Sequence, residues 1–250
     1  MIQLKSLREI EVMAEGGKIL AATVQMLRRE VRAGISTQDL DAIAETFIRS
    51  HAGATPAFKG LYGFPGTLCT SINQEIVHGI PSRKRVLNDG DIISIDVGVG
   101  YQGYFTDSAT TVAVGAVDAE TTRLLETTER SLAAGIAAAV PGNYLGDIGA
   151  AVQRVVEEAG FSVVRDLVGH GIGVAFHEEP QVPNYGKAKR GLKLMPGLTL
   201  AIEPMVNIGG PATRTLADKW TIVTVDGSRS AHFEHTVAIT DTGNRVLTAA

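Results

Sequence analysis

The sequence has little of three things that mark common protein classes: cysteine, long apolar runs and an excess of positive charge. Its 250 residues include one cysteine, Cys69, so it can form neither an intramolecular disulfide nor a cysteine-based zinc site. The longest weakly polar run, 132–140, falls far short of the roughly 20 residues that span a bilayer. A net charge of −4 argues against nucleic acid as the main ligand, because phosphate binding requires a basic surface.

We also expect no targeting segment at the start of the chain. Residues 1–9 carry Lys5, Arg8 and Glu9 with no long apolar stretch behind them, which is typical of neither a secretory signal nor an arginine-rich transit peptide. We therefore expect a cytoplasmic protein without membrane contact. The 44% of hydrophobic and 20% of charged residues are typical of a globular chain, and the length allows one large domain or two small ones.

Four stretches in which apolar residues recur at helical spacing predict two pairs of helices. Gly34 separates the first pair, and Ser36 or Thr37 can cap its second helix. The predicted helices cover 8–29, from 36 or 37 to near 53, 119–140 and 144–159. Gly34, Asp39 and Ala42 precede Gly142, Asp147 and Ala150 by 108 residues. The repeated order indicates a divergent duplication.

Apolar segments rich in β-branched residues follow each helix pair and predict strands joined by short turns. These segments are 92–99, 104–114, 198–202, 221–225 and 236–239. Because strands and helices are grouped rather than strictly alternating, we expect an α+β fold with an antiparallel sheet. Two related halves would place a functional site at their junction.

Two aspartates are predicted to face each other across a hairpin. Gly100 and Gly103 bracket residues 101–102, and a loop at these two residues would pair Asp96 with Asp107 across the strands. A bulge would shift this register. Adjacent carboxylates repel each other unless a cation lies between them, so the pairing indicates a metal site.

Three further candidate ligands lie near the other apolar segments. Glu203 and Glu234 flank strands in which a bare carboxylate is very costly to bury, and His170 lies among glycines that allow close approach to a ligand. Together with the two aspartates they make a mostly oxygen site for Mn²⁺, Fe²⁺ or Co²⁺, with Zn²⁺ tolerated. Two divalent ions about 3.5–4 Å apart would balance the charge and activate a water for hydrolysis.

With intervals of 11, 63, 33 and 31 residues, this set of five resembles the ligand set of the methionine aminopeptidases. Supporting segments are 53–58, 71–73, 77–81, 169–173 and 202–204. The resemblance covers nearly the whole chain and points to the compact type I form. It implies a pita-bread fold, in which an antiparallel sheet with flanking helices forms pseudo-twofold related halves. We expect a single catalytic domain, 1–250, with approximate halves 1–115 and 116–250.

The resemblance also implies a role for each ligand. Asp96 would chelate one metal ion, Asp107 and Glu234 would bridge both ions, and His170 and Glu203 would complete the other. Glu203 would in addition accept the proton of the attacking water and later pass it to the leaving amine.

Two more histidines lie in segments that match the family. The resemblance implies that His177 donates a hydrogen bond to the scissile carbonyl oxygen and that His78 contacts the peptide backbone or the leaving nitrogen. The remaining histidines, His51, His232 and His235, match no substrate contact, so we expect them to be solvated or structural.

A methionine side chain requires an apolar, polarizable pocket, and rings favour contact with its sulfur. The residues that match the family's pocket are Phe58, Leu61, Phe64, Cys69, Phe176 and Trp220. Leu61 and Phe64 stand where the family often has tyrosine, which leaves an apolar slot of altered shape.

The expected function is therefore a two-metal aminopeptidase that removes the initiator methionine of nascent chains whose second residue is small. A monomer is the family default. The basic residues Lys187, Lys189, Arg190 and Lys193 offer a transient ribosome contact, although four charges make only a modest patch and a solvated loop is the simpler interpretation.

Two alternatives remain. An Xaa-Pro peptidase of the pita-bread group would share the metal ligands but typically carries an extra N-terminal domain, for which 250 residues leave no room. A catalytically inactive pita-bread protein that binds peptides or histones would lack metal ligands, whereas all five are present here.

Overall fold

A computed structural model describes residues 2–249 and contains the four helices that the sequence predicts. Their bounds are α1 Leu7–Glu30, α2 Thr37–Arg49, α3 Ala119–Ala138 and α4 Leu145–Glu158. Side chains at the N-caps fix where the helices start: Ser6 and Ser36 form capping boxes with Glu9 and Asp39, and Asp118 accepts from a backbone N–H of α3. Within residues 2–249, no helix has the length and apolar character needed to cross a membrane.

The strands are short except for one long hairpin. They are β1 Ala54–Pro56, β2 Leu68–Ile72, β3 Glu75–Val77, β4 Ile92–Tyr101, β5 Tyr104–Ala113, β6 Ser162–Val163, β7 Gly169–Gly171, β8 Glu178–Val182, β9 Thr199–Ile202, β10 Met205–Asn207, β11 Thr213–Thr215, β12 Ile222–Thr224, β13 Ser230–His232, β14 His235–Thr240 and β15 Gly243–Val246. A 3₁₀ turn, Leu61–Gly63, precedes β2. The pairings described are antiparallel, as predicted, and the largest sheet has the order β15-β14-β9-β7-β8.

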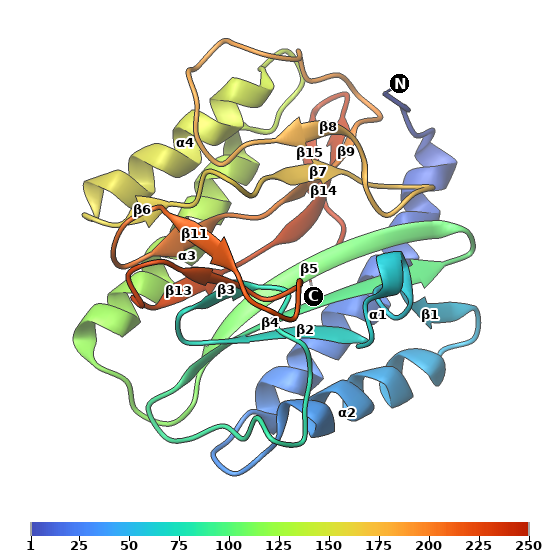
Figure 1. Ribbon diagram of the computed structural model, residues 1–250. Helices are drawn as coiled ribbons and strands as arrows, with labels where there is room; N and C mark the ends of the chain where they lie inside the picture. The colour runs from blue at the N-terminus through green and yellow to red at the C-terminus, as the bar shows by residue number, and fades with distance from the viewer. Residues whose placement is uncertain (1, 250) are drawn as a thin grey trace.

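Each helix pair covers a different sheet (Figure 1). Helices α1 and α2 pack on the sheet that contains β4, with a core that includes Leu20, Leu40 and Ile95. Helices α3 and α4 pack against the five-stranded sheet, with a core that includes Leu132 and Leu200. The two sheets meet where β5 runs beside β14.

The β5–β14 contact joins the two regions through reciprocal hydrogen bonds. Asp107 N donates to Thr236 Oγ1, whose hydroxyl donates to the Asp107 carbonyl, each at 2.8 Å. Nearby, Glu234 N donates to the carbonyl of Ala109 at 2.9 Å, and Ser108 Oγ donates to the carbonyl of Glu234 at 2.8 Å. Two of the predicted metal ligands are therefore held by backbone and hydroxyl contacts at the junction.

The predicted hairpin register is wrong by two residues. Tyr101 pairs with Tyr104, so the loop consists of Gln102 and Gly103 rather than of residues 101–102. Both loop residues have positive φ, 48° and 86°, as a type I′ turn requires. Asp96 consequently faces Ala109, and Asp107 lies diagonally from Asp96. Because the error is an even number of residues, both aspartates still point to the same face of the hairpin.

Candidate metal centre and substrate pocket

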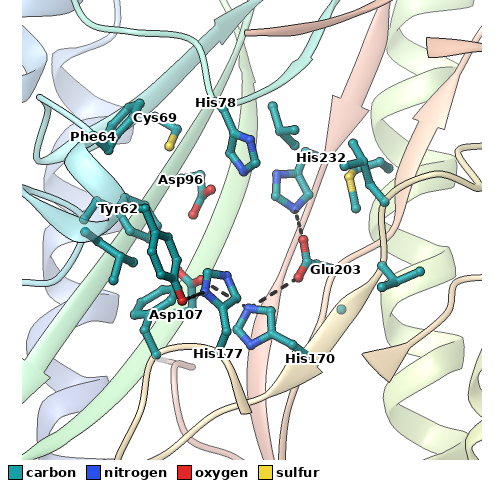
Figure 2. Close-up of a pocket in the computed structure, with 18 of the residues that line it drawn as sticks. Tyr62, Phe64, Cys69, His78, Asp96, Asp107, His170, His177, Glu203 and His232 are labelled. Carbon is teal, nitrogen blue, oxygen red and sulfur yellow. Dashed lines mark hydrogen bonds and ion pairs between the residues drawn. The ribbon is translucent and has the colours of Figure 1, made fainter. Parts of the chain in front are cut away.

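A pocket of about 480 Å³ lies at the junction, between the β4–β5 hairpin and strands β7 and β9 (Figure 2). Apart from Glu234, every site residue predicted from the sequence lines it. These residues are Phe58, Leu61, Phe64, Cys69, His78, Asp96, Asp107, His170, Phe176, His177, Glu203 and Trp220. Glu234 is buried beside the pocket floor, within reach of Asp107 and His170.

One wall of the metal centre comes from the hairpin. Asp96 lies in the middle of β4 and Asp107 near the start of β5, both buried. Burial raises the pKa of Asp96 to about 7, and burial together with the neighbouring Asp96 raises the pKa of Asp107 well above its usual range. Without a cation, the protein environment therefore opposes ionisation of both carboxyl groups.

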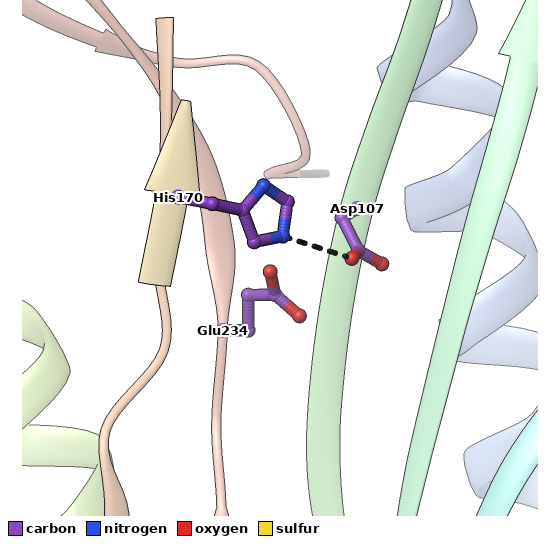
Figure 3. A group of neighbouring side chains, drawn as sticks. All are labelled: Asp107, His170 and Glu234. Atoms are coloured by element: carbon purple, nitrogen blue, oxygen red, sulfur yellow. Dashed lines mark ion pairs between the residues drawn. The ribbon is translucent and has the colours of Figure 1, made fainter. Parts of the chain in front are cut away.

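The facing wall comes from three separate places in the second half of the chain. His170 lies in β7, Glu203 directly follows β9, and Glu234 lies between β13 and β14. His170 Nε2 is 3.7 Å from Glu203 Oε1 and 4.0 Å from Asp107 Oδ2. One ligand atom each of Asp107, His170 and Glu234 lies within 4.8 Å of the others. The three side chains point toward one another (Figure 3).

The tautomer and the charge of His170 both suit a metal ligand. His170 Nδ1 lies 2.8 Å from the carbonyl oxygen of Gly171, so Nδ1 carries the proton and donates, leaving the Nε2 lone pair facing the carboxylates. Burial lowers the pKa of His170 to about 4, which keeps the ring neutral near pH 7. A neutral imidazole with a fixed tautomer suits a divalent cation.

The carboxyl groups fit the same cation chemistry. Burial raises the pKa of Glu203 to about 8 and that of Glu234 well above its usual range. Asp96 Oδ1 and Glu234 Oε1 are buried without a hydrogen-bond partner among the described residues. Buried acceptors of this kind are unfavourable unless something positive binds them, so the donor set fits divalent metal ions.

Aromatic side chains form the apolar side of the pocket. Phe64 and Trp220 pack edge to face with ring centroids 5.1 Å apart, and Phe58 packs against Phe176 at 5.2 Å. Cys69 is a buried free thiol in the same wall. This side offers contact for an apolar substrate group and adjoins the candidate metal centre, because Cys69 pairs with Asp96 across β2 and β4 and Phe176 packs on His170 with ring centroids 5.8 Å apart.

The two other histidines that the sequence singled out, His78 and His177, line the same pocket as the candidate ligands (Figure 2). His78 adopts a left-handed backbone conformation with φ of 60°, and burial lowers its pKa to about 4. His177 packs edge to face on His170 at 4.4 Å. Burial also lowers the pKa of His177, so both side chains are neutral near pH 7 and each can donate one hydrogen bond.

His232 was expected to be solvated or structural, and the structure contradicts the first of these alternatives. Its side chain lines the pocket with 1% of the residue exposed, and His232 Nε2 lies 3.5 Å from Glu203 Oε2. A histidine two residues before Glu234 in an apolar strand was the available signal. His51 and His235 lie away from the pocket, where they contact Phe47 and Thr248.

Tyr62 is a second pocket residue that the sequence did not single out. It stacks on His177 with ring centroids 5.7 Å apart, and its hydroxyl lies 3.4 Å from His177 Nδ1. It is 73% exposed and has a left-handed φ of 52° between Gly60 and Gly63. This strained conformation turns the ring toward the pocket, and the glycines on either side were the signal in the sequence.

Comparison with known proteins gives a consistent result over the whole chain. The family model "Metallopeptidase family M24" matches residues 11–241. Methionine aminopeptidase 1 of Bacillus subtilis is 53% identical over 248 residues, covering 99% of both chains, and the methionine aminopeptidase of Clostridium perfringens gives the same identity and coverage.

The similarity extends to solved structures. The methionine aminopeptidase of Thermotoga maritima superimposes with a TM-score of 0.98 at 43% identity, with full coverage of both chains. A prolidase of Pyrococcus horikoshii shares the fold, with a TM-score of 0.80 at 23% identity, and this chain covers 63% of it. The prediction of a pita-bread α+β fold is confirmed by these superpositions.

Proposed function

The chain belongs to metallopeptidase family M24, and we propose from this premise that it hydrolyses the first peptide bond of chains that begin with methionine. The family membership and the level of identity to methionine aminopeptidases make it a metal-dependent aminopeptidase. The observation that carries the proposal is the group of three buried carboxyl groups, a fourth that is 13% exposed and one neutral imidazole, which lies against the apolar lining of the pocket.

The residues that would hold two divalent ions are the five predicted ligands. In the proposal Asp96 would hold one ion, Asp107 and Glu234 would serve both, and His170 and Glu203 would hold the other. When bound, the ions supply a water activated for attack near neutral pH and an electrophilic contact for the substrate carbonyl. Co²⁺, Mn²⁺ and Fe²⁺ suit this donor set, and Zn²⁺ is tolerated.

The chain's own residues then handle protons and position the substrate. Glu203 accepts the proton of the attacking water and passes it to the leaving amine. His177 donates a hydrogen bond to the scissile carbonyl oxygen, where negative charge builds in the transition state. His78 contacts the peptide backbone or the leaving nitrogen.

The methionine side chain would occupy the apolar side of the pocket. Phe58, Phe64, Phe176 and Trp220 present ring edges and faces, which make favourable contacts with a thioether sulfur. Leu61 and Cys69 complete this lining, so the slot accepts a long unbranched side chain. We further propose that the second residue of the substrate is small.

The wider setting is also a proposal. A single catalytic domain, 1–250, built of approximate halves 1–115 and 116–250, would act as a monomer on nascent polypeptides in the cytoplasm. The basic residues between β8 and β9 are exposed and offer a transient ribosome contact. These residues are Lys187, Lys189, Arg190 and Lys193.

Hydrolysis of three peptides by metal-stripped protein tests the function. After resupply of Mn²⁺, Co²⁺ or Fe²⁺, we expect cleavage of Met-Ala-Ser, little cleavage of Met-Leu-Ser and none of Ala-Pro. Cleavage of Ala-Pro alone would favour an Xaa-Pro peptidase. Failure to cleave Met-Ala-Ser with every metal, while the metals still bind, would favour a catalytically inactive binding protein.

A further inference from the structure

A buried ion pair lies directly behind the loop that carries His177. Lys5 Nζ donates to Glu178 Oε2, and the two side chains are only 3% and 9% exposed. Every other pair of Lys or Arg with a carboxylate in residues 2–249 is more exposed; the nearest case is Arg85–Glu75, at 24% and 16%. A lysine so fully removed from water requires a specific partner, and Glu178 directly follows His177.

Hydrogen bonding and the adjacent helix also hold the backbone of Lys5 in place. Its backbone N–H donates to the carbonyl of Gly197 at 2.8 Å, and the next residue, Ser6, is the N-cap of α1. The side chain passes over Gly173, where a Cβ atom would lie 2.1 Å from Lys5 Cε. Any side chain at residue 173 would therefore collide with the lysine. Lys5 also precedes the segment 11–241 that the family model matches.

Glu178 also forms a hydrogen bond within the loop that carries His177. Its Oε1 accepts a hydrogen bond from Ala175 N at 3.0 Å, and Gly173 N donates to the carbonyl of Ala175 at 3.1 Å. These contacts bracket Phe176 and His177. Glu178 thus uses one oxygen to shape the loop and the other to bind Lys5.

His177 itself has little else to hold it. The residue as a whole is exposed, although its ring is partly withdrawn from water against neighbouring rings, and the side-chain hydrogen bond described for it is the long one to Tyr62. Its ring otherwise packs on the rings of His170 and Phe176. The position of the imidazole therefore depends on the backbone of the loop more than on contacts of the side chain.

We propose that Lys5 is a positioning residue that acts through Glu178 to hold His177 over the reacting carbonyl. Without the ammonium group, the Glu178 carboxylate would be buried unpaired, and it would turn toward water rather than stay in place. Ala175 N would then lose its acceptor and the loop would loosen. The proposal rests on the proposed role of His177 in peptide hydrolysis.

The test compares Lys5→Met with Arg245→Met. Arg245 pairs with Glu11 of α1 at the surface, so its replacement removes a charge next to the same helix without touching the loop. In Lys5→Met we expect kcat to fall by about 10- to 100-fold with little change in KM, because displacement of a catalytic group by about 1 Å costs that much. Arg245→Met should keep wild-type kcat.

Repeating the Lys5→Met substitution in protein that lacks the His177 side chain shows whether the loss of kcat depends on His177. In His177→Ala protein, Lys5→Met should lower kcat no further, whereas a general loss of stability would lower it again. Adding Glu178→Gln to Lys5→Met should recover part of the activity, since a neutral amide still accepts from Ala175 N and leaves no unpaired charge. Equal losses from Lys5→Met in both backgrounds would overturn the proposal.

A measurement without catalysis separates this proposal from the proposed function. The NMR signals of the His177 ring, assigned by their absence in His177→Ala, should shift or broaden in Lys5→Met and stay unchanged in Arg245→Met. Should Lys5→Met not fold, Glu178→Gln alone must alter the same signals. Unaltered ring signals contradict the positioning role, whereas wild-type protein that leaves Met-Ala-Ser intact contradicts only the peptidase function.

Discussion

The two halves of the molecule begin alike and then diverge. In each, a long helix ends before a glycine with positive φ, Gly34 at 87° and Gly142 at 90°, and a shorter helix follows. In each, an aspartate in that helix's first turn, Asp39 or Asp147, accepts from the backbone N–H three residues before it. The strands that follow differ: the first half has one hairpin of two ten-residue strands, and the second half has short strands.

This difference decides how each half supplies its predicted metal ligands. Asp96 and Asp107 lie on one hairpin, so a single turn fixes them relative to each other. His170, Glu203 and Glu234 come from separate strands or their ends, and only the assembled five-stranded sheet brings them together. The first wall is locally encoded, whereas the second depends on tertiary structure, and the proposed metal centre requires both walls to meet.

The largest expected effect comes from replacing Asp107, the predicted ligand of the first wall that lies beside His170 of the second wall. Asp107→Asn should lower kcat/KM by about 10⁴-fold, because a ligand proposed to contact both ions is lost. Equilibrium dialysis should show less than the wild-type content of bound Mn²⁺. Glu126→Gln, an exposed substitution on α3, is the matched control and should keep both properties. Wild-type metal content in Asp107→Asn would contradict the bridging role.

Glu203→Gln tests the corresponding residue of the second wall. We expect kcat/KM to fall by about 10³-fold through loss of the proton acceptor. Metal content should fall less than in Asp107→Asn, since the amide oxygen remains a weak ligand. If Glu203→Gln loses metal as completely as Asp107→Asn does, its proposed role as proton acceptor cannot be separated from its role as ligand.

The packing of the second wall should make it the less tolerant of added volume. In Gly171→Ala, the new Cβ would lie 2.3 Å from the carbonyl oxygen of Glu179, a backbone atom that cannot move aside without displacing β8. We expect the free energy of unfolding to fall by about 3 kcal/mol. Urea denaturation measures this, and a change below about 1 kcal/mol would mean that β7 and β8 can separate easily.

In the metal-free protein, each wall contains a carboxyl group whose protonation affects the stability of the fold. Burial raises the pKa of Asp96 to about 7 and of Glu203 to about 8, above the values of the unfolded chain. Between about pH 6.5 and 8.5 the folded protein therefore holds more protons than the unfolded chain, so its stability falls as pH rises, by up to about 1.4 kcal/mol per pH unit for each group. The lowered pKa values of His78 and His170, about 4, act in the opposite sense up to about pH 7, because unfolded imidazoles with a pKa near 6.5 still hold protons there, so the fall in stability is clearest above about pH 7.

Urea denaturation in EDTA at about pH 6.5, 7.5 and 8.5 measures this slope. Bound Mn²⁺ replaces the protons and should remove it. Asp96→Asn should reduce the dependence of the free energy of unfolding on pH in the lower part of this range, and Glu203→Gln should reduce it in the upper part. The two variants therefore separate the contribution of the first wall from that of the second. A metal-free protein that gains stability over this range contradicts the raised pKa values.

The same contrast explains what could be predicted from the sequence. The helices follow from apolar spacing and from caps such as Ser36, and the five ligands follow from carboxylates in apolar segments and from their resemblance to a family. The register error at Gln102 arose because a turn residue other than glycine adopts positive φ. Lys5 was missed because its partner, Glu178, is distant in sequence and no local pattern encodes the contact. His232 lies two residues before Glu234, which was a signal, but its contact with Glu203 is equally distant in sequence.

The smallest expected effect concerns the turn that sets the first wall. Gly103 has φ of 86°, and no atom lies within 4 Å of the position that a Cβ would occupy, so Gly103→Ala adds conformational strain but no collision. We expect a loss of about 1 kcal/mol in urea denaturation and unchanged kcat with bound metal. Gly103→Asn should recover most of the loss, because asparagine tolerates the left-handed region. If Gly103→Ala instead lowers kcat while Gly103→Asn does not, the turn controls the placement of Asp107 relative to Asp96, and the ten-residue strands alone are insufficient to hold the register.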